Sequence, residues 1–249
     1  MTRHYVRLVV VLGLFVAIST LDRPVLAQAD RWATELAAFE NQDRQAPAIG
    51  GVVFVGSSSI RLWDLAKYFP GLPAINRGFG GSEIGDSVNH VDLLVIRHKP
   101  RTVIFYAGDN DIAAGKSPQQ VADAFKAFAT KVRAVLPDTR LAFIAIKPSI
   151  QRWSLIAQIR QANALVREYC DADDRLGFID VDGPMLGWDA KPRKDLFIAD
   201  GLHLSPKGYA LWTVLVEPFV APVVPPQGGS PDPADGPRGP ERPALQERR

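Results

Sequence analysis

Five short apolar runs, none of which alternates with polar residues, are spaced along this 249-residue chain. A strand of a parallel sheet that is covered on both faces has apolar neighbours on each side, so such runs predict buried parallel strands. The runs lie at Gly51–Val55, Pro73–Asn76, Thr102–Ala107, Leu141–Ile146 and Leu176–Val181.

Helical patterns occupy the stretches between these runs. The clearest begins at "SPQQ", where Ser117 is followed by a proline at the first helical position and a glutamine three residues after the cap. Apolar residues then recur at steps of four and three, and Pro137 ends the pattern. These apolar residues are Val121, Phe125, Phe128, Val132 and Val135.

Further helical segments are expected over Ile84–His98, Trp153–Cys170 and Pro206–Phe219. Strand and helix therefore alternate along the chain. This alternation predicts a three-layer α/β/α sandwich, in which helices cover both faces of a five-stranded parallel sheet.

The two ends of the chain differ from this pattern. A basic start, an apolar run of 11 residues and the A-x-A site at Ala27–Ala29 predict a cleavable signal peptide over residues 1–29, and hence export to the periplasm or the medium. The apolar run is too short to span a bilayer, so no membrane span is expected after cleavage. Residues 222–249 hold 8 of the 20 prolines and predict a disordered tail. One folded domain, residues 30–221, remains.

Composition excludes some classes of function. The chain is 47% hydrophobic and 22% charged, as in an ordinary globular protein. The predicted signal peptide carries three arginines and one aspartate, which account for the whole formal charge of +2, so the mature domain is neutral and offers no electrostatic case for nucleic-acid binding. The single cysteine, Cys170, cannot form an intramolecular disulfide and is expected to be a small buried apolar residue.

Polar residues follow four of the predicted strands. The stretches are "GSSSI", "NRGFGGSEI", "GDNDIAAG" and, further along, "ADGLHLS". In a parallel sheet such loops gather at the carboxyl edge, where ligands bind. Together they supply a hydroxyl, a histidine, a carboxylate and N–H donors, the groups that an acyl-transfer site needs.

Each of these residues also has a structural interpretation when it is taken alone. Asp200 could cap the helix that begins near Ser205, Gly80–Gly81 could form a simple turn, and Asn110 could form an Asx turn. Their combination on one predicted edge favours a serine hydrolase.

The four stretches resemble the blocks of the SGNH hydrolase family, also called GDSL-type esterases, over residues 52–220, and "KPRTVIFYAGDND" and "DGLHLSPKGYALW" are most similar to the platelet-activating-factor acetylhydrolase type. The resemblance implies a flavodoxin-like fold, an esterase activity, and neither a cofactor nor a metal. It implies Ser58 as the nucleophile and His203 as the base, oriented by Asp200. The implied oxyanion donors are the backbone N–H groups of Ser58 and Gly81 and the side chain of Asn110.

The sequence departs from the family at Ser57, where an aspartate is usual and supports the loop. Ser57 and Ser59 remain alternative nucleophiles. The G-x-S-x-G signature of α/β-hydrolases is absent, because residue 60 is isoleucine.

Patterns for nucleotides and metals fail at particular residues. "NRGFGGSE" ends in Glu83 where a dinucleotide fingerprint needs glycine, and "NDIAAGKS" begins with Asn110 where a phosphate loop needs glycine. His90, His98 and the run Asp171–Asp174 lack ligand spacing and are expected to be solvated surface groups.

Three functions remain open. The first is a serine esterase acting on a small-molecule or glycan ester; the absence of a long apolar insertion between strands favours short acyl groups such as acetyl. The second is a non-catalytic carbohydrate- or lipid-binding protein that has the same fold. The third is an O-acyltransferase that uses the same residues.

Overall fold

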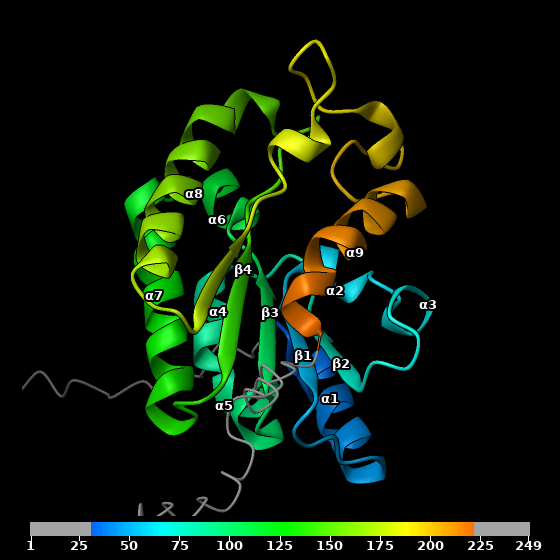
Figure 1. Cartoon of the computed structure of the whole chain (residues 1–249), viewed down its shortest axis with the longest axis vertical. Helices are drawn as coiled ribbons and strands as arrows, with labels where there is room; N and C mark the ends of the chain where they lie inside the picture. Colours follow the sequence, from blue (N-terminus) through cyan, green and yellow to red (C-terminus); the bar gives the residue numbers. More distant parts are fainter. Residues whose placement is uncertain (1–30, 222–249) are drawn as a thin grey trace, which may run out of the picture.

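The computed structural model describes residues 31–221, which contain a five-stranded sheet whose strands are all parallel (Figure 1). The strands are β1 (Val52–Gly56), β2 (Ala74–Gly78), β3 (Thr102–Tyr106), β4 (Arg140–Ile144) and β5 (Leu176–Ile179). Each lies on one of the five predicted runs, with ends that differ by up to two residues. The α/β/α sandwich is thus confirmed, while the predicted signal peptide and tail lie outside the described residues.

The strand order is β2-β1-β3-β4-β5, the flavodoxin-like order that the resemblance implied. Strand β1 pairs with β2 on one side and with β3 on the other, so that Phe54 lies opposite both Asn76 and Ile104. The chain changes direction across the sheet between β1 and β3, the point at which such folds bind ligands. The loops after the first three strands are therefore neighbours at one edge.

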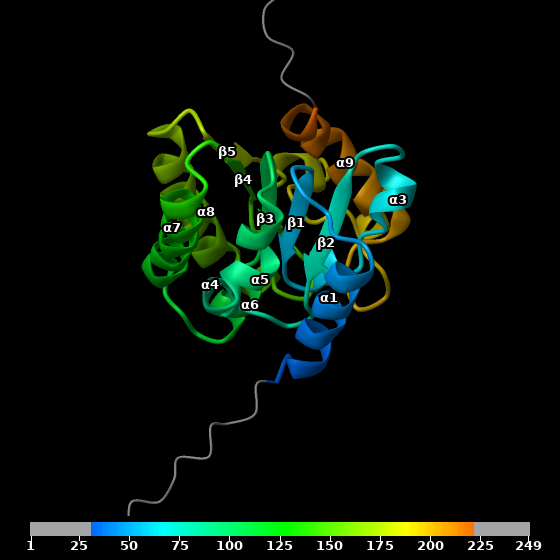
Figure 2. The same ribbon diagram turned by 90° about the horizontal axis from the view of Figure 1, so that it is seen from below.

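Alternate side chains of the strands feed two separate cores. One face of the sheet, with Val53, Phe105 and Phe143, packs against α1 (Ala33–Gln45), α4 (Ile84–Asn89), α5 (Val91–Leu94), α7 (Pro118–Val135) and α8 (Ile156–Asp171). The other face, with Phe54, Tyr106 and Ile144, packs against α2 (Ser58–Arg61), α3 (Leu65–Tyr68) and α9 (Pro206–Val220). Figure 2 shows these two helical layers on opposite sides of the sheet.

Helix α7 begins as the sequence predicts. The Ser117 hydroxyl accepts from the backbone N–H of Gln120 at 3.2 Å, and the Gln120 side chain accepts from the N–H of Ser117 at 2.8 Å. Four of its five predicted apolar residues are buried, whereas Val135 in the last turn is exposed. Cys170, in the last turn of α8, is buried as predicted.

The single helix predicted over Ile84–His98 is wrong. The structure has α4, α5 and a 3₁₀ turn, η1 (Ile96–His98), in its place. The turns direct the His98 ring inward, where Nδ1 lies 3.1 Å from the carbonyl oxygen of Ala48 and Nε2 lies 3.2 Å from that of Leu93. His98 is consequently buried, not a solvated surface group as expected, and burial lowers its pKa.

Helix α1 was not predicted, nor were three short helices: α2, α3 and α6 (Asp109–Ala113). Helices of four or five residues are too short to display a periodic apolar pattern. Between residues 31 and 221, no helix combines the length and apolar character needed to cross a membrane.

Candidate active site

The first loop turns sharply out of β1 into α2. Gly56 has a φ of +137°, and a side chain there would overlap the carbonyl oxygen of Tyr106 on the neighbouring strand. The N–H of Ser57 then donates to that carbonyl at 2.9 Å. Glycine at this position therefore permits the turn that presents Ser58 at the first position of α2.

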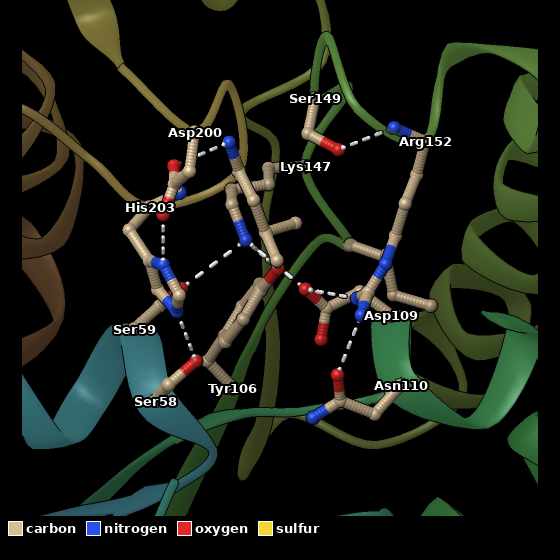
Figure 3. A network of polar contacts seen from close by, with 12 residues as sticks. Ser58, Ser59, Tyr106, Asp109, Asn110, Lys147, Ser149, Arg152, Asp200 and His203 are labelled. Atoms are coloured by element: carbon tan, nitrogen blue, oxygen red, sulfur yellow. Dashed lines mark hydrogen bonds and ion pairs between the residues drawn. The ribbon is translucent and has the colours of Figure 1, made fainter. Parts of the chain in front are cut away.

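The three adjacent serines have different surroundings. Ser57 and Ser59 are each 1% exposed, whereas Ser58 is half-buried. The Ser58 hydroxyl lies 3.0 Å from Nε2 of His203 (Figure 3). The Ser59 hydroxyl accepts instead from Lys147 at 3.1 Å, and that of Ser57 has no hydrogen-bond partner among residues 31–221. Of the three, Ser58 is the one that contacts the imidazole.

Asp200 holds the other side of that imidazole. Its Oδ2 lies 2.6 Å from Nδ1 of His203, and its Oδ1 accepts the backbone N–H groups of Leu202 and His203, each at 2.9 Å. Burial alone would raise the pKa of Asp200, but these three hydrogen bonds outweigh it and lower the pKa to about 2. The helix-cap interpretation of Asp200 is wrong, because Ser205 accepts the N–H of Gly208 and is the N-cap of α9.

Possible oxyanion donors lie at the ends of three loops. Gly81 belongs to a turn, with a φ of +74°. Within the described residues, neither its N–H nor that of Ser58 has a hydrogen-bond acceptor. The Nδ2 of Asn110, in α6, donates to the carbonyl oxygen of Ser82 at 2.9 Å. Asn110 is thus held beside the Gly81 turn.

The sequence-based interpretation missed the loop after β4, which reaches the same edge of the sheet. Lys147 in this loop is 1% exposed, and its ammonium lies 3.1 Å from Ser59 Oγ, 2.8 Å from the Tyr106 hydroxyl and 3.1 Å from Asp109 Oδ2. Three acceptors match the three donors of a protonated lysine. The signal that could have found this residue was its position directly after the fourth predicted strand.

Arg152, in the same loop, completes a buried charged cluster (Figure 3). Its Nη1 lies 2.9 Å from Asp109 Oδ2, and its Nη2 donates to Asn110 Oδ1 at 2.8 Å. Burial favours the neutral form of Asp109, yet Lys147 and Arg152 outweigh it and keep the pKa of this carboxyl below its usual range. Two cations thus face one carboxylate next to Asn110.

Groups that resembled phosphate or metal ligands have other partners. Lys116, from "NDIAAGKS", forms ion pairs with Glu83 at 2.6 Å and with Asp111 at 3.1 Å. Asp173 is paired with Arg133. Across residues 31–221, no three His, Cys, Asp or Glu side chains gather as a metal site would require.

Comparisons with known proteins identify the family. The model of the GDSL-like lipase/acylhydrolase family matches residues 60–211, more than half of the chain; the match begins two residues after Ser58 and includes Gly81, Asn110, Asp200 and His203. No curated protein gives a significant match.

Solved structures share the fold at low sequence identity. One from Streptococcus pneumoniae, described as a platelet activating factor, has a TM-score of 0.70 at 18% identity, over 76% of this chain and 92% of that chain. A GDSL-like lipase from Bacteroides thetaiotaomicron has a TM-score of 0.62 at 22% identity, over 76% of this chain and 95% of that chain. A family 3 carbohydrate esterase from Talaromyces cellulolyticus has a TM-score of 0.54 at 18% identity, over 68% of this chain and 95% of that chain.

Proposed function

The chain belongs to the GDSL-like lipase/acylhydrolase family and is an ester-hydrolysing enzyme, and on that premise we propose that it is a serine esterase whose triad is Ser58, His203 and Asp200. The observation that carries the proposal is the continuous chain of contacts from the Ser58 hydroxyl through the imidazole to the Asp200 carboxylate. A serine hydroxyl becomes a good nucleophile when a neighbouring imidazole takes its proton, and the carboxylate fixes the tautomer in which Nε2 is free to do so.

The reaction proceeds in two halves. Ser58 Oγ attacks the ester carbonyl carbon while His203 Nε2 takes its proton, and the carbonyl π electrons move to the oxygen. The tetrahedral intermediate then expels the alcohol oxygen, which receives the proton from His203, and an acyl-serine remains. Water attacks this acyl group with the same base and releases the acid, so that Ser58 regains its proton.

Developing negative charge on the carbonyl oxygen needs fixed donors. We assign this role to the N–H groups of Ser58 and Gly81 and to Nδ2 of Asn110. An amide nitrogen carries two hydrogens, and the carbonyl of Ser82 accepts one of them, so the second is available to the substrate. One such donor is worth about 3 to 4 kcal/mol of barrier.

Short acyl esters of small alcohols or glycans are the proposed substrates. The sequence has no long apolar insertion between its strands that could enclose a fatty chain. The structural likeness to a carbohydrate esterase fits an O-acylated sugar as one form of the substrate.

Covalent labelling tests the proposal directly. A fluorophosphonate should label the wild-type protein and not Ser58→Ala, whose kcat should fall by roughly 10³ to 10⁶ fold in a folded protein. A panel of nitrophenyl esters from acetate to palmitate should give the highest kcat/KM with the shortest acyl chains. Ser57→Ala and Ser59→Ala are the matched controls: activity that survives Ser58→Ala but is lost in one of them would move the nucleophile. A protein that neither labels nor turns over esters would be a binding module, and acylated sugar products would indicate a transferase.

We also infer from the N-terminal sequence that the enzyme is exported. Its basic start, apolar run and A-x-A site fit cleavage after Ala29. N-terminal sequencing of protein expressed from the full gene should begin at Asp30, and an intact Met1 in the mature protein would contradict export by this route.

A further inference from the structure

An apolar groove of about 330 Å³ adjoins the proposed base. Its walls include Leu62, Tyr68, Ile198 and Pro206, and His203 itself faces it. Leu62 and Ile198 are 47% and 48% exposed, so both apolar side chains are accessible from the groove. The volume is at the lower end of the range for small-molecule sites.

The groove is fixed to the triad through the backbone. The N–H of Leu62 donates to the carbonyl of Ser58 at 2.9 Å, and the N–H of Ile198 donates to the carbonyl of His203 at 2.9 Å. The Tyr68 hydroxyl donates to the carbonyl of Pro206 at 3.1 Å, and this hydrogen bond fixes the Tyr68 ring as part of the groove wall. Backbone hydrogen bonds therefore fix Leu62 relative to the nucleophile Ser58 and Ile198 relative to the base His203.

The geometry points to this groove as the binding site for the alcohol half of the ester, specifically for an alcohol that carries a ring with an apolar face. This inference rests on the proposed function. In that mechanism His203 delivers its proton to the departing alcohol oxygen, so the alcohol must lie on the side of the ester that faces the imidazole. An aromatic wall and two aliphatic side chains suit the face of an aromatic or sugar ring.

Substrates that differ in one half of the ester test the assignment. In Leu62→Ala/Ile198→Ala, kcat/KM for benzyl acetate should fall about tenfold or more, because one lost apolar contact in a closed pocket is worth about 10-fold or above and each of these two half-exposed side chains supplies part of that. The kcat/KM for methyl acetate should change less than twofold. The ratio of the kcat/KM values for methyl butyrate and methyl acetate should stay constant. An acetylated methyl glycoside, run in parallel, distinguishes a sugar ring from an aromatic one. Val214→Ala, at a residue of α9 that is 64% exposed, is the matched control.

Binding can be measured without turnover. Benzyl alcohol or a methyl glycoside should shift the ring signals of Tyr68 in Ser58→Ala protein, and the shifts should vanish when Leu62→Ala/Ile198→Ala is added. A changed acyl-chain preference, or unchanged kinetics and binding in the variant, would overturn the assignment. An inactive wild-type protein that still binds these alcohols in the groove would instead contradict the proposed esterase and leave the binding site standing.

A second inference concerns Arg152, and a different set of contacts carries it. The guanidinium donates to Oδ1 of Asn110, and a guanidinium has donors only. The opposite edge of the same amide donates to the carbonyl of Ser82, which can only accept. Both partners thus specify one orientation of the amide, with Nδ2 towards the Gly81–Ser82 turn.

We propose that Arg152 is a positioning residue for the oxyanion hole. Asp109 Oδ2 lies against Nη1 on the other side of the guanidinium, and the same carboxylate is paired with Lys147. The Arg152 side chain is 16% exposed, so water competes little for its ion pair with Asp109 and its hydrogen bond to Asn110. The cluster aligns Asn110 before the substrate arrives, and a donor already in place does not have to be reoriented as the charge develops.

The substitution Arg152→Lys removes the group that aligns Asn110 but keeps a positive charge beside Asp109. It keeps a cation beside Asp109, so the protein should remain folded, but an ammonium lacks the planar fork that reaches Asn110 and Asp109 together. The expected result is a fall in kcat of about 10-fold to 100-fold with KM changed less than threefold, since part of one oxyanion donor is lost. Arg160→Lys, in which the exposed partner of Asp182 is changed, is the matched control.

A double-mutant cycle decides the mechanism. On an Asn110→Ala background, Arg152→Lys should have almost no further effect on kcat, and in Arg152→Lys the side-chain amide signals of Asn110 should lose their wild-type NMR position. Equal effects of Arg152→Lys on both backgrounds, or an unchanged amide signal, would overturn the positioning role. Full activity of Asn110→Ala would contradict the proposed oxyanion hole itself, while the amide signal would still report whether Arg152 orients Asn110.

Discussion

The turn that presents Ser58 to His203 is fixed by the side chain and carbonyl of Ser59 and by the backbone of Ser57. Ser59 is bound to Lys147 through its hydroxyl and to Tyr209 through its carbonyl, and the N–H of Ser57 is bound to β3. These contacts fix a turn that has one half-buried hydroxyl in its centre. At the residue scale, the sequence identified the right types of residue for this turn, but it could not separate three identical side chains by their surroundings.

Asp200→Asn should lower kcat/KM by about 10³-fold to 10⁴-fold while the protein stays folded. The amide oxygen can still accept the two backbone N–H groups, but its NH₂ group can hold the imidazole in the tautomer that cannot take the Ser58 proton. Steady-state kinetics with a short-chain ester, together with circular dichroism, check both halves of this expectation. A folded variant with more than a tenth of wild-type activity would show that the carboxylate does not orient the base.

The pH profile identifies the group that limits activity in acid. The pKa of Asp200 is about 2, so this carboxylate is ionised throughout the range above pH 4. Because only a neutral imidazole can accept the Ser58 proton, we expect kcat/KM to fall along one limb as the pH is lowered and His203 becomes protonated. A flat wild-type profile, or a limb that persists in His203→Ala, would place the base elsewhere.

At the scale of elements, the sequence predicted the start of a helix where several capping residues stand together. The start of α7 could be predicted because the cap, the proline and the glutamine stand at fixed spacings. The 3₁₀ turn η1 could not be predicted, because the His98 ring that it carries contacts Ala48, 50 residues earlier in the chain. Very short helices such as α2 are set by the strand ends that precede them.

Ser117→Ala should lower the free energy of unfolding by about 1 kcal/mol, because the N–H of Gln120 loses its acceptor at the start of α7. In a domain of this size the change corresponds to a fall in Tm of about 2 to 4 °C. Ser154→Ala, at an exposed serine before α8, should leave Tm unchanged. If both substitutions have the same effect, the capping hydrogen bond contributes nothing measurable to the helix.

Cys170 should be inert in the folded protein. Burial in the last turn of α8 raises the pKa of this thiol to about 12, so the reactive thiolate is absent at pH 8. Iodoacetamide should label it only after denaturation.

The same shift makes stability depend on pH. An unfolded cysteine ionises near about 8.5, and the folded one does so only near 12. Stability from the protonated thiol is therefore complete below about pH 8.5 and declines as the pH rises towards 12. Between pH 8.5 and 11 the loss of stability should be shallower in Cys170→Ala than in the wild type, and parallel losses would contradict this origin.

At the scale of the whole molecule, the sheet and the edge that carries the site could be predicted, because alternation of strands and helices fixes where the loops meet. The charged cluster behind the site could not. Lys147 meets Ser59 across 88 positions in the sequence and Asp109 across 38, and nothing in the loop "KPSIQRW" alone shows which carboxylate will neutralise it. The charged cluster arises from tertiary contacts that only the folded sheet creates.

Ending the chain after Ala221 should leave Tm and esterase activity nearly unchanged. Both cores and all the proposed site residues lie within residues 31–221, and α9 is closed by Arg101, which donates to the carbonyl of Val220 at 2.8 Å. The removed segment, residues 222–249, is rich in proline and poor in apolar side chains, so it can add little hydrophobic stabilisation. Thermal unfolding and kcat/KM of the full and shortened proteins provide the comparison. A fall of many degrees would mean that these residues pack against the domain, and a changed kcat/KM at constant Tm would mean that they act at the site.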